Sequence, residues 1–263
     1  MKDDTETGAP AQSGSTNNIR ALIGCAGWNI PKAYGDRFPR EGSHLERYSQ
    51  VFSCVEINSS FYRPHKPATY ERWAAAVPPN FRFSVKVPRT ITHFRRLRGI
   101  DAEFNSFMEE VSALGPKLGP LLVQLPPTFA FDMVVVGGFL DVLHEKFSGE
   151  IACEPRHPSW FGDKPSELMA NYNVARVAAD PSVLPEAAEP AGSTNLLYYR
   201  LHGSPRIYYS GYTEDYLRTI ADKITEAITK GSTVWCIFDN TAEGAATGDA
   251  LSVIAKLSTG QGR

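Results

Sequence analysis

Charged and polar side chains interrupt several short apolar runs of this sequence close to the carboxyl end of each run. Strands that are buried on both faces read as continuous apolar runs, so a charge inside one needs a partner or a ligand. Carboxylates beside basic groups in a shielded site can serve as general acid and base and can stabilise developing negative charge. The residues that we expect to be catalytic are Glu56, Lys86, Glu154, Arg200 and His202.

Alternation with apolar neighbours places these polar residues on one face of their runs. Glu56 and Asn58 flank Ile57, and Lys86 lies between two valines. Because successive side chains of a strand point to opposite faces, residues two positions apart share a face. We therefore expect several strands to direct polar side chains into one shared space.

The elements that must position these residues follow a regular order. Eight runs rich in Val, Ile, Leu, Phe or Tyr alternate with segments whose apolar residues recur every three or four positions. This order is typical of repeated strand and helix units around a parallel sheet. We predict an α/β protein, a single TIM-like (β/α)8 barrel, in preference to an open doubly wound sheet. The predicted strands are residues 20–26, 51–58, 81–87, 120–125, 150–155, 173–179, 196–202 and 233–240.

The chain divides into one predicted domain and two tails. Residues 1–18 are polar and rich in Gly, Ser and Thr, so we expect a disordered N-terminal tail. The barrel domain is expected over residues 19–258, and residues 259–263 form a C-terminal tail. Residues 181–194 are rich in Pro and Ala without an apolar stripe, which predicts an irregular sixth helical unit.

Rings, imidazoles and guanidinium groups follow the predicted strands at the face where barrel enzymes place their sites. The segment 203–212 combines glycines with Arg206 and three tyrosines, which would suit a lid over a ligand. The residues that we expect to bind substrate are Trp28, Asn58, Tyr62, Arg89, His93, Gln124, Arg156, His157, Asp239 and Asn240.

Composition excludes several classes of protein. The formal net charge of -2 provides no global basic field, so binding to long nucleic acid is not expected. The sequence has no apolar run of membrane-spanning length and no secretory signal pattern, so we expect a cytoplasmic protein that does not enter a membrane. Four dispersed cysteines within apolar runs predict buried thiols.

Motifs for nucleotide and organic cofactors are missing, and the sequence leaves any cofactor unknown. It contains no phosphate-binding loop, no dinucleotide fingerprint, no H-E-x-x-H and no G-x-S-x-G. A cation could be held only if Glu56, Glu154, His202 and Asp239 converged, and basic neighbours in the same layer would repel it. We therefore predict no metal site.

Seven ordered segments resemble the YecE-like family, catalogued as domain of unknown function 72. The resemblance covers residues 23–257 and implies a TIM-barrel-like fold with a pocket lined by these segments, without an established reaction. Pro155, where the family usually has Phe, and Asp239, where it commonly has Asn, depart from the expected pattern. The segments are GCAGW (24–28), VEINSSFYRP (55–64), FSVKVPRTITH (83–93), LLVQLPPTF (121–129), CEPRHPSW (153–160), YYRLHG (198–203) and FDNT (238–241).

Our leading hypothesis is an enzyme that uses acid–base chemistry on a small polar or anionic substrate, such as a phosphoester or sugar derivative. It would be a hydrolase, lyase or isomerase that needs no organic cofactor. Glu56 and Glu154 would act as general base and acid, and Lys86 and Arg200 would steady negative charge. The residues that would orient the ligand are Asn58, Gln124 and Asn240.

Two alternatives remain open at this point. The first is a non-catalytic protein that binds a nucleotide, a modified base or a nucleic-acid end by stacking on Trp28 and Tyr62, with charge from Arg89, Arg156 and Arg206. The second is a structural ion-pair network that only closes the top of the barrel. The sequence carries no signal for oligomeric state.

Overall fold

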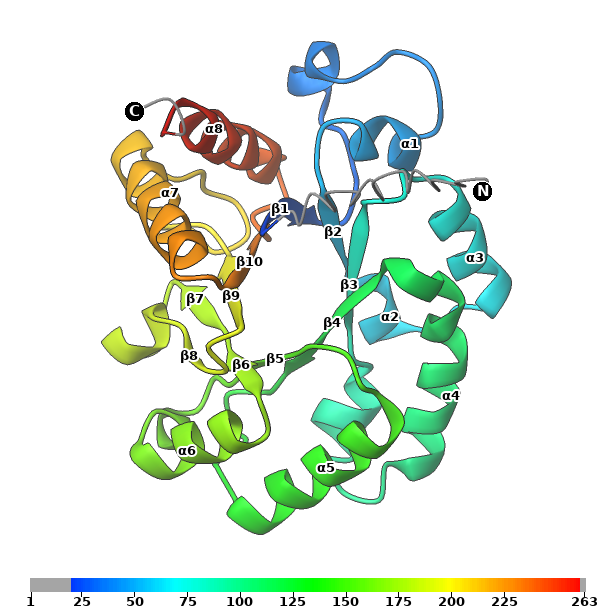
Figure 1. The fold of residues 1–263 in the computed structure, drawn as a ribbon, viewed down its shortest axis with the longest axis vertical. Helices are drawn as coiled ribbons and strands as arrows, with labels where there is room; N and C mark the ends of the chain where they lie inside the picture. Colours follow the sequence, from blue (N-terminus) through cyan, green and yellow to red (C-terminus); the bar gives the residue numbers. More distant parts are fainter. Residues whose placement is uncertain (1–19, 261–263) are drawn as a thin grey trace, which may run out of the picture.

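The computed structural model describes residues 20–260, which form a ring of parallel strands with helices around its outside (Figure 1). This arrangement confirms the predicted TIM-like barrel. The strands are β1 (Ala21–Ala26), β2 (Cys54–Ile57), β3 (Arg82–Lys86), β4 (Leu118–Gln124), β5 (Ile151–Glu154), β6 (Val174–Arg176), β7 (Ala178–Asp180), β8 (Ala191–Gly192), β9 (Leu196–Leu201) and β10 (Thr233–Phe238).

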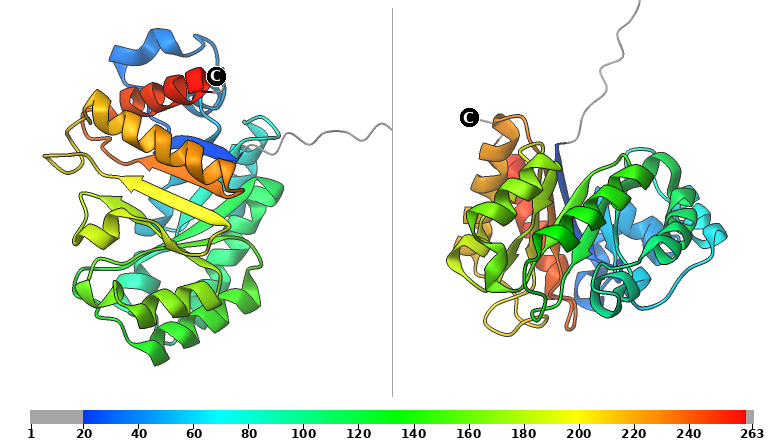
Figure 2. Two further views of the ribbon diagram at one scale, coloured as in Figure 1. Left: turned by 60° about the vertical axis from the view of Figure 1, so that its left-hand side comes forward. Right: turned by 90° about the horizontal axis from the view of Figure 1, so that it is seen from below.

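The helices pack against the outer face of the ring, as the views in Figure 2 show. Their starts follow from the sequence: Asp132 caps α5 by accepting hydrogen bonds from two backbone amides, Thr213 caps α7, and Pro67 is the first residue of α3. The α-helices are α1 (His44–Ser49), α2 (Ser59–Tyr62), α3 (Pro67–Ala75), α4 (Asp101–Val111), α5 (Met133–Lys146), α6 (Asp163–Asn171), α7 (Glu214–Thr229) and α8 (Ala245–Gly260).

The ring closes through one extended segment that changes its pairing partner. β6 pairs in parallel with β5, whereas β7, which follows directly, pairs in parallel with β9. The switch lies at Val177, whose amide still donates to Cys153 of β5 at 2.8 Å, while Ala178 is already in register with Tyr199. The single strand predicted for residues 173–179 is therefore split in two.

The sixth unit is irregular, as its composition predicts. After β7 the chain forms a short 3-10 helix, Pro185–Ala188, and then β8, which pairs antiparallel with β6. Prolines have no backbone N–H and cannot continue a regular helix, which explains why this stretch of the chain forms no full α-helix.

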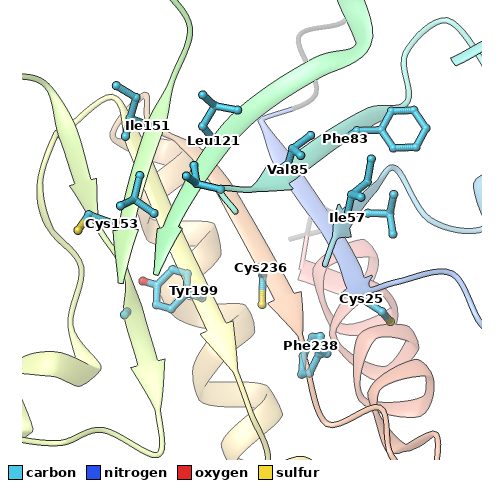
Figure 3. Packing of buried hydrophobic residues seen from close by; sticks show 14 of the residues in the cluster. Cys25, Ile57, Phe83, Val85, Leu121, Ile151, Cys153, Tyr199, Cys236 and Phe238 are labelled. Atoms are coloured by element: carbon cyan, nitrogen blue, oxygen red, sulfur yellow. The ribbon is translucent and has the colours of Figure 1, made fainter. Parts of the chain in front are cut away.

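The core has two layers. The larger lies between the sheet and the helices. Figure 3 shows part of it, including Ile57, Val85, Leu121 and Phe238. The smaller fills the barrel interior with residues of the opposite parity, among them Cys54, Leu122, Ala152, Tyr198 and Ile237. The four cysteines are buried free thiols, as expected.

Both ends of the chain extend beyond the described residues. The expected N-terminal tail over residues 1–18 lies outside them, as do residues 261–263. α8 continues to Gly260, so the first residues of the expected C-terminal tail are helical. None of the described helices is long and apolar enough to cross a membrane.

Candidate functional site

The polar residues at the carboxyl ends of the strands continue the interior face of the barrel one layer beyond its apolar filling. Glu56 lies two residues after Cys54, and Arg200 lies two residues after Tyr198; both earlier residues belong to the interior layer. Residues two apart on a strand share a face, so the later ones also point inward. The same offset relates Ser84 to Lys86, Leu122 to Gln124, Ala152 to Glu154 and Ile237 to Asp239.

Arg200 is the centre of this layer and contacts three carboxylates. Its Nη2 donates to Glu56 Oε1 at 2.8 Å, and its Nη1 donates to Glu154 Oε2 at 3.0 Å. Nη2 also lies 2.9 Å from Asp239 Oδ2. Burial alone would lower the pKa of Arg200, but the three carboxylates raise it well above its ordinary value. Arg200 is therefore a fixed buried cation.

His202 bridges two of the same carboxylates. Its Nε2 lies 3.2 Å from Glu154 Oε1 and its Nδ1 lies 3.1 Å from Asp239 Oδ2. A neutral imidazole has one N–H, so only the doubly protonated ring donates to both. Burial opposes that charge, but Glu154 and Asp239 outweigh it and raise the pKa of His202. The arrangement favours an imidazolium ion.

Glu154 contacts three basic side chains. Besides Arg200 and His202, it accepts from Arg156, whose Nη2 lies 2.8 Å from Glu154 Oε1. Burial would raise the pKa of Glu154, but the charges of Arg200, His202 and Arg156 hold it well below its usual value. The pKa of Asp239 is also lowered, because Arg200 and His202 outweigh its burial. Both groups are carboxylates at neutral pH.

Glu56 is held from below by residues that we did not predict. The Tyr198 hydroxyl donates to Glu56 Oε2 at 2.8 Å and lies 2.9 Å from Ser84 Oγ, which can donate to it in turn. Glu56 is fully buried, and Arg200 occupies its other lone pairs. Tyr198 lies two residues before Arg200 on the same face of β9, and this spacing could have indicated its role. We had counted it only as one of the apolar residues of the strand.

Lys86 lies in the same layer without a partner in contact. The described residues give its Nζ no hydrogen bond and no ion pair; it lies 4.3 Å from the centroid of the Phe61 ring. Burial, aided by the charge of Arg200, lowers the pKa of Lys86 to about 8, although Glu56, Glu154 and Asp239 partly oppose this effect. Lys86 therefore loses its proton more readily than an ordinary lysine does.

A cavity of about 330 Å³ opens beside this network, between β5 and the irregular sixth unit. Glu154, Arg156 and His202 are its charged lining residues, and Tyr208 also lines it. Tyr208 has a φ of 71°, in the left-handed region, and its ring lies 5.7 Å from that of His202. Apolar residues line the opposite wall: Val177, Ala179, Pro181, Val183, Ala187 and Ile207.

Besides Arg156 and Asp239, three further predicted binding residues join the network or border it. Asn58 donates to Asp239 Oδ1 at 3.4 Å, and its own buried Oδ1 has no hydrogen-bond partner among the described residues. Gln124 is buried and in register with Glu154 across β4 and β5. His93 stacks edge-on against Phe61, 5.0 Å away.

The other predicted binding residues serve other contacts. Trp28 packs edge-on against the ring of Trp73. His157 caps a short 3-10 helix by accepting from the amide of Ser159. Asn240 is buried but turns toward α8, where it donates to Asp249 at 2.7 Å.

Tyr62 and Arg89 belong to a separate hollow between α2 and α4. Tyr62 is 63 % exposed, and the guanidinium of Arg89 lies 5.7 Å from the centroid of its ring. This hollow, of about 420 Å³, shares none of the network's carboxylates.

The donor set is poorly suited to a metal ion. Glu56, Glu154 and Asp239 already accept hydrogen bonds or ion pairs from Arg200, which stands where the three carboxylates converge. Among residues 20–260, no group of three or more His, Cys, Asp or Glu side chains is placed to hold one. A cation would have to displace a guanidinium that the fold buries.

Solved structures with this fold superpose on nearly the whole length of this chain. A DUF72 family protein from Thermotoga maritima superposes with a TM-score of 0.77 at 24 % identity, covering 90 % of this chain and 99 % of that one. The 3-keto-D-glucoside 4-epimerase YcjR from E. coli aligns with a TM-score of 0.53 at 13 % identity, covering 92 % and 99 %. At these identities the likeness concerns the fold alone.

Sequence comparison gives the family. The protein UPF0759 YecE of Escherichia coli O157:H7 is 35 % identical over 164 residues, which are 62 % of this chain and 58 % of that protein. The match thus spans little more than half of the relative's length. The family described as "Protein of unknown function DUF72" matches residues 22–263. This chain belongs to the DUF72 family.

Proposed function

We propose that this protein is an enzyme that moves protons on a small, polar, anionic substrate bound at the carboxyl ends of the barrel strands. The observation that carries the proposal is His202, placed between Glu154 and Asp239 on the wall of the 330 Å³ cavity. A charged imidazole whose two N–H groups are held by Glu154 and Asp239 is a general acid in a fixed orientation. Solvent-exposed structural histidines lack both features.

The two members of the acid–base pair act on each other. When His202 gives its Nε2 proton to a substrate oxygen, Glu154 loses one hydrogen bond and part of the positive charge that lowers its pKa. Glu154 then becomes a stronger base and can take a proton from the same substrate. An isomerase, an epimerase or a lyase needs such a pair of proton transfers.

The charges of the site select an anionic substrate. Arg200, Arg156, Lys86 and protonated His202 are four cations, and Glu56, Glu154 and Asp239 are three anions, so one positive charge is left over. Arg156 lines the cavity and keeps 26 % of its side chain exposed, so it can bind a phosphate or carboxylate.

Other residues of the network hold the reacting groups in position. Glu56 is fully buried and holds Arg200, so it positions the network and does not touch substrate. Asn58 donates to Asp239 Oδ1 and so helps to hold that carboxylate in place. The fold neighbour YcjR is an epimerase of a keto-glucoside, which is compatible with a sugar-like substrate in a barrel of this type.

The test is proton exchange in heavy water. The protein is incubated in D2O with a metabolite extract and with defined sugar phosphates and keto acids, and the loss of C–H signals is followed by NMR. We expect exchange in the native protein and a reduction of about 100-fold or more in Glu154→Gln and His202→Asn.

Tyr62→Phe, outside the cavity, is the matched control and should exchange at the native rate. Compounds that bind and raise the melting temperature without any exchange or bond cleavage would refute the proposal. They would instead support the non-catalytic binding protein.

A further inference from the structure

The position of Lys86 sets it apart from the other lysines of this chain. It ends β3 on the interior face, two residues after Ser84, which contacts Tyr198 in the layer below. Its side chain is buried, with 6 % of its surface exposed, and the Phe61 ring covers the ammonium group. Lys117, by contrast, donates to two backbone carbonyls, and Lys230 pairs with Glu226 on the surface.

The neighbouring carboxylates are committed to other partners. Glu56 bonds Arg200 and Tyr198, Glu154 bonds Arg200, Arg156 and His202, and Asp239 contacts Arg200, His202 and Asn58. Charged groups therefore surround Lys86, but none of the three carboxylates contacts its ammonium group.

A buried amine without a contacting anion gives up its proton easily and keeps its lone pair for chemistry. At neutral pH, the pKa of about 8 leaves roughly 300-fold more free amine at Lys86 than the ordinary value of 10.5 would. The three carboxylates are close enough to oppose this shift, so they would also stabilise a positive charge that forms on the nitrogen later.

We propose that Lys86 is the nucleophile of this site and forms an imine with an aldehyde or ketone substrate. The inference rests on the proposed function and narrows its substrate class to anionic carbonyl compounds, such as keto or aldo sugar phosphates. The geometry that carries it is a buried amine without an ion-pair partner at the end of β3, in the same interior layer as Glu154 and His202.

The step balances without a further reactant. The Nζ lone pair bonds to the carbonyl carbon, the C=O electrons pass to oxygen, and that oxygen takes up two protons in all and leaves as water. One of these protons comes from the attacking amine, and His202 supplies the other, which leaves its imidazole neutral. The iminium ion that results acidifies the neighbouring C–H bond, and the acid–base pair of Glu154 and His202 then moves that proton.

Reductive trapping tests the proposal. The native protein is treated with formaldehyde and cyanoborohydride from about pH 6 to about 10, and modified peptides are quantified by mass spectrometry. Because lower basicity also reduces nucleophilicity, we expect Lys86 to react about 10-fold faster than Lys230 at neutral pH, with a midpoint near pH 8. Glyceraldehyde 3-phosphate and dihydroxyacetone phosphate then serve as larger probes, and at least one should yield an adduct on Lys86.

Lys86→Arg keeps the charge and should abolish the adduct, whereas Lys230→Arg should leave it unchanged. A Lys86 that reacts no faster than Lys230, or phosphate-bearing probes that modify only surface lysines, would overturn the inference. Proton exchange separates the two proposals: if Lys86→Arg retains exchange that Glu154→Gln loses, the imine is wrong and the acid–base site stands. If Lys86 is trapped but the native protein exchanges no proton, the proposed function is wrong.

Discussion

Replacing Arg200 with methionine removes the one cation that three buried carboxylates share. Fully buried Glu56 would keep only the Tyr198 hydroxyl as a partner. Removing one member of a buried ion pair costs about 3–5 kcal/mol, because the remaining charge stays buried and unpaired. We expect Arg200→Met to lower the free energy of unfolding in urea by about this amount near pH 8.

The loss of stability in Arg200→Met should depend on pH. In the native protein the pKa values of Glu154 and Asp239 are lowered despite burial, largely by Arg200. A carboxyl with a lowered folded pKa contributes stability above its unfolded pKa, and this contribution is lost as the pH falls through the folded value. The variant has less of this contribution to lose, so the stability deficit of Arg200→Met should narrow as the pH falls toward about 4.

Arg218→Met, at an exposed position on α7, is the matched control and should change stability by no more than about 0.5 kcal/mol. Unfolding is followed by circular dichroism at several pH values for all three proteins. A cost below about 1 kcal/mol for Arg200→Met that does not vary with pH would refute the network as described.

Two further predictions concern the barrel and its histidine. In Gly24→Ala the new Cβ would lie 2.1 Å from the Cys54 carbonyl oxygen, so we expect a loss of about 3 kcal/mol or more in urea unfolding. Gly138→Ala in α5 meets no atom within 4 Å and should gain about 0.5–1 kcal/mol; equal effects would contradict the packing. The pKa of His202 measured by NMR should exceed 6.5 and fall in Asp239→Asn; the stability it contributes is present at low pH and lost as the pH rises through that value.

The barrel and the shared interior layer were predictable because both depend on local periodicity. Alternation along a strand fixes which side chains share a face, and this placed Glu56, Lys86 and Arg200 together without knowledge of their partners. The irregular sixth unit was predictable for a similar reason, because the prolines spaced through residues 181–194 disrupt a helix.

Features that depend on distant partners were not predictable. The break at Val177 reflects a change from pairing with β5 to pairing with β9. The amino-acid sequence of residues 173–179 does not indicate this change. Asn240 was predicted to bind substrate from its place at a strand end, and its hydrogen bond to Asp249 of α8 could not be predicted from the sequence. Tyr198 reads as a core residue, although its hydroxyl anchors Glu56.

Two features of the network argue against a purely structural role. A structural plug is most stable when every buried charge is paired, yet Lys86 has no contacting anion and the layer carries one positive charge more than it neutralises. A plug also has no need of a cavity, yet Glu154, Arg156 and His202 border one of about 330 Å³. On the proposed function, an anionic carbonyl compound would supply the contact that Lys86 lacks in the free protein.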